Sequence, residues 1–135
     1  MLKIAALLNF VISLGHIVAL FFLRDTFRYF GIENILNGLF SIHPFLPFIV
    51  TIVAAVAFFI CGLYALSADG VIRRLPLLEF GIYLIGILFL AKGIMEFFES
   101  IFSQRHQIIV AVTAISIGLL YLVGGYKRLG ISISQ

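Results

Sequence analysis

The sequence predicts an all-α integral membrane protein: a bundle of four transmembrane helices with one short interfacial helix between the first two. Of the 135 residues, 63% are hydrophobic and only 11% are charged, whereas soluble domains have roughly 45–50% apolar and about 25% charged residues. A single core of this size cannot bury that much apolar surface, so the excess must face lipid. Four separate apolar stretches are also long enough to cross the hydrocarbon as helices.

The same composition excludes other classes of protein. A disordered chain would be less hydrophobic and more highly charged. A disulfide-stabilised secreted domain needs several cysteines, and this chain has only Cys61. The net charge of +3 does not indicate nucleic-acid binding, because the nine Lys and Arg residues are scattered singly or in pairs between apolar runs. We therefore expect the lipid bilayer, and no nucleic acid, as a partner.

The first predicted span covers residues 4–23. Its apolar run is too long for the core of a cleavable signal peptide, and residues 24–27 after it offer no small-x-small cleavage site. We expect this segment to remain as a membrane helix.

A longer connection to the second span contains a predicted helix at residues 32–41. Its apolar side chains recur at the i, i+3, i+4, i+7, i+8 positions of one helical face, with polar residues between them. The apolar positions are Ile32, Ile35, Leu36, Leu39 and Phe40. This pattern predicts an amphipathic helix in the outer membrane interface, acting either as a lid over a cavity or as a connector among the head groups.

The second and third spans are predicted at residues 47–67 and 77–98, as a tight antiparallel hairpin. Pro47 suits the first turn of a helix, where its missing amide donor costs nothing. Asp69 and Gly70 then act as a helix stop signal in the turn at residues 68–76.

The fourth span is predicted at residues 107–126, so one domain covers residues 1–128 and a short tail covers 129–135. Orientation follows from Lys and Arg residues in short loops. With a cytoplasmic N-terminus, the inner side holds five of them and the outer side three. The inner set is Lys3, Arg73, Arg74, Lys127 and Arg128, and the outer set is Arg24, Arg28 and Arg105. This bias favours both termini in the cytoplasm.

Three ionisable side chains fall inside the predicted spans: His16, Lys92 and Glu96. Such groups are expensive in hydrocarbon, so they mark a function or a necessary polar contact. At about 1.5 Å rise per residue, they lie about 4, 7 and 13 Å outward of the centres of their helices. Three hydroxyl residues lie in the same half or near the midplane: Thr51, Thr113 and Ser116. These six residues predict a small ligand-binding pocket in the outer half of the membrane.

Two alternatives apply to these residues. Lys92 and Glu96 are four residues apart and share a helix face, so they form either part of a binding site or a structural ion pair that snorkels to the interface. His16 is either functional or bonded to a neighbouring carbonyl or hydroxyl group.

Small residues predict where the helices approach closely. Ala57, Cys61 and Ala65 form one stripe on the second span, and Ala114 with Gly118 forms another on the fourth. With one cysteine there is no pair for disulfide exchange.

The supply of reactive residues argues against most membrane chemistries. The three histidines are too few for a di-metal hydroxylase, and only His16 lies inside a span. No phosphate-binding loop, serine nucleophile elbow or metalloprotease motif is present. We therefore expect no metal, no cofactor and no catalytic residue.

Residues 61–76, reading CGLYALSADGVIRRLP, resemble the second-to-third helix turn of small four-helix bacterial membrane proteins of the DoxX-like kind. Gly15-His16 is the reverse of the His-Gly pair typical of the first helix in that family, and the arginine expected there is missing. The resemblance implies a bacterial inner-membrane protein, sometimes associated with redox or quinone metabolism. It transfers no functional residue to this chain.

The leading hypothesis is a non-enzymatic membrane protein that binds or passes a small or lipophilic ligand in the outer-half pocket. A second is a structural or accessory subunit that packs against another membrane protein or a second copy of this chain. A third is a membrane-embedded enzyme with His16 as its base. Bound lipid or solute beside Lys92 would favour the first, and an occluded ion pair would favour the second.

Overall fold

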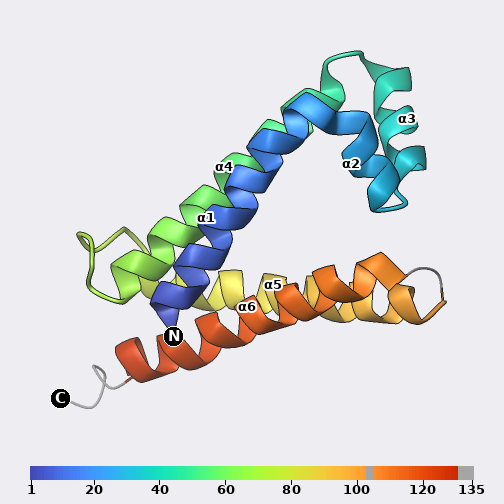
Figure 1. The fold of residues 1–135 in the computed structure, drawn as a ribbon. Coiled ribbons are helices and arrows are strands. Elements are labelled where there is room, and N and C mark those ends of the chain that lie inside the picture. The colour runs from blue at the N-terminus through green and yellow to red at the C-terminus, as the bar shows by residue number, and fades with distance from the viewer. Residues whose placement is uncertain (103–104, 131–135) are drawn as a thin grey trace.

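The computed structural model describes residues 1–102 and 105–130, and in that part of the chain all regular structure is helical (Figure 1). Within these described residues, four helical segments are long and apolar enough to cross a membrane. They are Leu2–Tyr29, Leu46–Ala68, Leu78–Glu99 and Ile108–Leu129. The four predicted apolar helices are therefore confirmed. The boundaries of the last three are close to the predicted ones, whereas the first segment continues to Tyr29, six residues beyond its predicted end at residue 23.

The first apolar segment is divided into three pieces. Helix α1 (Leu2–Ala19) ends in one 3₁₀ turn, η1 (Leu20–Phe22), and the chain changes direction at Phe22 (φ −130°, ψ 40°) into α2 (Leu23–Tyr29). Gly31, with φ 69°, makes the turn into α3 (Glu33–Ile42). A helix thus forms at the predicted position between the first two spans.

The remaining chain forms α4 (Leu46–Ala68), α5 (Leu78–Phe102) and α6 (Arg105–Leu129). Pro47 lies in the first turn of α4, as predicted. The long helices pack as two antiparallel pairs, α1 with α4 and α5 with α6 (Figure 1). The pairs meet at one end, which we call the joined end, and separate toward the other, the diverging end. The predicted single bundle is not confirmed over the full length of the helices.

The pair α1 and α4 is held by small residues on α4 and by one interhelical hydrogen bond. The Ser13 hydroxyl donates to the Ala55 carbonyl over 2.7 Å, and Gly62 faces the ring of Phe10, whose nearest atom would lie 2.5 Å from an added Cβ. Ala65 is also buried here. The prediction for Ala57 is wrong, because Ala57 is exposed. The packing face passes through Ala55 instead, seven residues before Gly62 and therefore on the same side of the helix.

The pair α5 and α6 approaches more closely still, because glycines meet backbone atoms. A Cβ added at Gly93 would lie 2.8 Å from the amide nitrogen of Ile115. One added at Gly118 would lie 2.9 Å from the carbonyl oxygen of Gly86. Gly118 and its neighbour Ala114 are both buried, so the predicted small-residue stripe on this helix is confirmed.

Tyr121 of α6 joins the two pairs. Its side chain is fully buried, and its hydroxyl donates to the Cys61 carbonyl of α4 over 2.6 Å while accepting from the Asn9 amide of α1 over 3.1 Å. Its ring stacks on Phe89 of α5 (centroids 6.2 Å apart), which in turn contacts Phe58 of α4 (5.9 Å). One residue thus contacts or bonds to three other helices.

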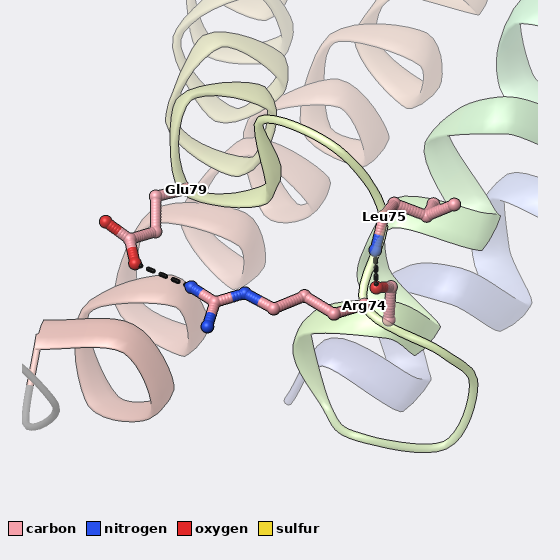
Figure 2. A network of polar contacts seen from close by, with 4 residues as sticks. Arg74, Leu75 and Glu79 are labelled. Carbon is pink, nitrogen blue, oxygen red and sulfur yellow. Dashed lines mark hydrogen bonds and ion pairs between the residues drawn. The ribbon is translucent and has the colours of Figure 1, made fainter.

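Ion pairs connect three helices at the joined end. Asp69, at the end of α4, has a side chain only 8% exposed, and its two oxygens face Arg128 at 3.1 Å and Lys3 at 3.7 Å. These ion pairs link the end of α4 to the start of α1 and the end of α6. The Ser67 hydroxyl in the last turn of α4 accepts from the Leu75 amide of the following loop, over 2.9 Å (Figure 2). Arg74 of the same loop pairs with Glu79 of α5, also over 2.9 Å.

Candidate functional site

His16 lies on α1, half-buried, with its ring against Phe58 of α4 (centroids 5.0 Å apart). Its Nδ1 is 2.8 Å from the Ile12 carbonyl oxygen. Because a carbonyl only accepts hydrogen bonds, Nδ1 carries a proton, and in the neutral form of the ring Nε2 therefore presents a lone pair. Within residues 1–102 and 105–130, Nε2 has no hydrogen-bond partner. The expected bond to a neighbouring carbonyl therefore forms at one nitrogen and leaves the other as an acceptor.

Lys92 and Glu96 form the ion pair that their spacing allows, with Nζ and Oε1 2.5 Å apart. The Lys92 side chain is 54% exposed, whereas that of Glu96 is 20% exposed. The second carboxylate oxygen of Glu96, Oε2, is buried and has no partner in the described part of the chain. A buried acceptor without a donor is costly, so this oxygen is a place where a ligand group or water would be stabilised.

The three hydroxyl residues bond within their own helices. Thr51, Thr113 and Ser116 each donate to the carbonyl four residues earlier, over 2.7 to 2.8 Å. Thr51 is buried, Thr113 is half-buried and Ser116 is exposed. Among the described residues, no hydrogen bond joins any of the six predicted site residues to another except that between Lys92 and Glu96.

Helix geometry nevertheless places part of the predicted set on the facing sides of the two pairs. Phe89 of α5 contacts Phe58 of α4, and Lys92 and Glu96 follow Phe89 by three and seven residues, which is the same side of α5. His16 packs on the same Phe58 from α1. The three ionisable groups thus flank one aromatic contact. They belong to the C-terminal parts of α1 and α5, and these two helix ends separate from each other (Figure 1).

Asn9 is a buried polar residue that the predicted site lacks. It is fully buried on α1, its amide donates to the Ala5 carbonyl over 2.8 Å and to Tyr121, and its Oδ1 has no partner among the described residues. The signal in the sequence is spacing: Asn9, Ser13 and His16 are four and three residues apart, which puts all three on one face of the helix.

A hollow of about 290 Å³ lies at the diverging end, where η1 and α2 meet α3 and α4. Its lining consists of four phenylalanines and two leucines, apart from the adjacent charges of Arg24 and Asp25. The guanidinium of Arg24 lies over the ring of Phe40, with 5.8 Å to its centroid. Hydropathy does not predict this hollow, because it depends on the change of chain direction at Phe22.

Comparisons with known proteins find no relative of this chain. The chain matches no protein-family model, no curated protein and no solved structure. Among the described residues, no three His, Cys, Asp or Glu side chains are grouped as metal ligands. The resemblance to DoxX-like proteins therefore stays a prediction, and the chemistry of the site rests on its own residues.

Proposed function

We propose that this protein is a multi-pass membrane protein that binds, or passes on, a lipophilic molecule carrying a polar group, between the facing sides of its two helix pairs. The polar lining is His16, Lys92 and Glu96, and the aromatic rings of Phe58 and Phe89 form the apolar base. Thr113, on the same side of α6 as Tyr121, extends the lining.

The observation that carries this proposal is the unpartnered Oε2 of Glu96. A purely structural pair with Lys92 uses one carboxylate oxygen, and a snorkelling carboxylate would expose the other to water. Here the Lys92 side chain is the more exposed partner and the Glu96 oxygen is buried. That geometry suits a ligand that approaches from the bilayer and donates a hydrogen bond.

The acceptors on both walls favour the same class of ligand. Glu96 Oε2 and His16 Nε2 both need a donor, so a hydroxyl or amine group on an apolar body fits better than a carbonyl group alone. We propose that the two pairs close around this molecule into the four-helix bundle that the sequence predicts.

The membrane setting completes the proposal. Both termini lie in the cytoplasm and the diverging end faces outward, which agrees with the five-to-three distribution of Lys and Arg. On this orientation α3 lies in the outer interface, with Leu36 buried and its polar residues exposed. The DoxX-like resemblance adds the bacterial inner membrane as the compartment.

The test is ligand retention. The full chain is purified in a mild detergent, and the co-purifying lipophilic molecules are extracted and quantified by mass spectrometry per mole of protein. Glu96→Gln keeps the shape of the side chain but weakens its acceptor, so the amount of the specific molecule should fall about tenfold, the factor expected for one charge-assisted hydrogen bond.

Glu79→Gln is the matched control. Glu79 lies on the same helix and also pairs with a basic residue, Arg74, but at the joined end, so its substitution should leave retention unchanged. A folded Glu96→Gln protein that keeps the wild-type amount, or a wild-type extract with the composition of the bulk membrane, would contradict the proposal.

A further inference from the structure

The hollow at the diverging end has the composition of a lipid head-group site. Exposed aromatic side chains line it from η1 and α4, with Phe21 80% and Phe48 37% exposed. One basic and one acidic residue, Arg24 and Asp25, line it as well. At about 290 Å³ it lies at the lower end of the range of ligand pockets, so it suits a head group better than a whole amphiphile.

Arg24 is the basic group in this region that lacks an acidic partner. In the described part of the chain, Arg28 pairs with Glu33 over 2.9 Å, whereas no carboxylate lies within 4 Å of Arg24. The ring of Phe40 instead holds the Arg24 guanidinium, which fixes its position and leaves its donors available. A planar guanidinium with free donors matches the geometry of a phosphate group.

Asp25 gives the same hollow an acidic group. Asp25 also lies within electrostatic range of Arg28 but forms no ion pair within 4 Å in the described part of the chain. A ligand that brings only a negative charge would satisfy Arg24 and be repelled by Asp25. A zwitterion satisfies both.

We propose that this hollow binds the head group of a zwitterionic phospholipid with a primary ammonium group, that is, a phosphatidylethanolamine. Its phosphate contacts Arg24, its ammonium contacts Asp25, and its acyl chains run along the exposed rings of Phe21 and Phe22 toward α1 and α4. A membrane lipid is favoured over a free phosphate compound because these rings continue the apolar surface of the long helices. This site is separate from the one between the helix pairs, so each can fail without the other.

The test uses the full chain in mild detergent, with native mass spectrometry after addition of equimolar phosphatidylethanolamine, phosphatidylglycerol and phosphatidylcholine of identical acyl chains. The wild type should retain phosphatidylethanolamine preferentially. Arg24→Gln should weaken that binding about tenfold, as expected for the loss of charge-assisted bonds to phosphate. Asp25→Asn should remove the preference for phosphatidylethanolamine over phosphatidylglycerol while retaining binding.

Arg73→Gln is the control, because Arg73 is exposed in the loop at the joined end and has no ion-pair partner in the described chain. It should leave binding unchanged. Should Arg24→Gln fail to fold, Arg24→Lys serves instead, since a lysine keeps the charge but not the planar donor pair and should bind several-fold more weakly. Equal retention of all three lipids by the wild type, or unchanged binding in the folded Arg24 variants, would overturn the proposal.

Discussion

Tyr121→Phe tests whether one hydroxyl group joins the two helix pairs. The substitution keeps the ring, and with it the stacking on Phe89, but removes the oxygen that accepts from Asn9 over 3.1 Å and donates to the Cys61 carbonyl over 2.6 Å. The Asn9 amide nitrogen would then still donate to the Ala5 carbonyl. The Asn9 Oδ1 would not change, because it has no hydrogen-bond partner among the described residues even in the wild type.

The expected loss follows from the number of bonds removed. Interhelical hydrogen bonds in membrane proteins are worth about 0.6 kcal/mol on average and about 1.7 kcal/mol at most, so two of them should contribute about 1 to 3 kcal/mol. Because Tyr121 is fully buried, water cannot replace the lost partners cheaply. We expect a value in the upper half of that range.

The assay is reversible unfolding in mixed detergent micelles, followed by circular dichroism. Tyr126→Phe is the control, because Tyr126 lies on the same helix with 70% of its surface exposed and should change stability by less than about 0.5 kcal/mol. A double-mutant cycle with Asn9→Leu measures the bond itself, and the two losses should be non-additive. Equal, small effects of both tyrosine substitutions would refute the role of the hydroxyl group.

Three further predictions concern the ends, the packing and the topology. Asp69→Asn should lower stability by about 1 to 3 kcal/mol, as for lost bonds to a charged group, and this loss should shrink in high salt; no change would show that the ion pairs are not structural. Gly93→Ala should cost about 1 to 3 kcal/mol because the added methyl group meets the backbone of α6, whereas Gly15→Ala, with nothing within 4 Å, should be neutral or slightly stabilising. In a Cys61→Ser background, an impermeant thiol reagent should label Gly38→Cys in intact cells and Val71→Cys only after permeabilisation; the reverse pattern would invert the topology.

The positions of the spans could be predicted because they depend on properties that are local in sequence. The predicted spans at residues 47–67 and 77–98 correspond to Leu46–Ala68 and Leu78–Glu99. A proline in the first turn and a turn signal at the end fix such boundaries without knowledge of the rest of the fold. The arrangement of the helices has no such local signal.

Packing faces were harder to predict because both sides of a membrane helix are apolar. In a soluble helix the buried face differs from the exposed face in polarity, but here Ala57 and Ala55 are chemically identical and only Ala55 is buried. The buried face is determined by where a small residue on one helix fits against a large residue on another. Gly62 of α4, for example, packs against the ring of Phe10 of α1. That partner is distant in sequence, so a stripe of small residues predicts close packing but not which of two neighbouring stripes is used.

The same distinction explains the mixed outcome for the predicted site. Counting residues from the ends of a span gives the depth of a side chain but not its direction. Depth alone includes Ser116 in the predicted site although it is exposed, and it omits Asn9, which is fully buried. Direction becomes predictable only where a residue shares its face with a contact between the pairs, as Glu96 does with Phe89. On those faces, the buried oxygens that lack a partner in the described chain belong to Asn9 and Glu96, and both are acceptors. Two acceptors cannot form a hydrogen bond with each other, so the group that pairs with either oxygen must be a hydrogen-bond donor. A retained molecule without a hydroxyl or amine group would therefore leave the buried Glu96 oxygen without a partner.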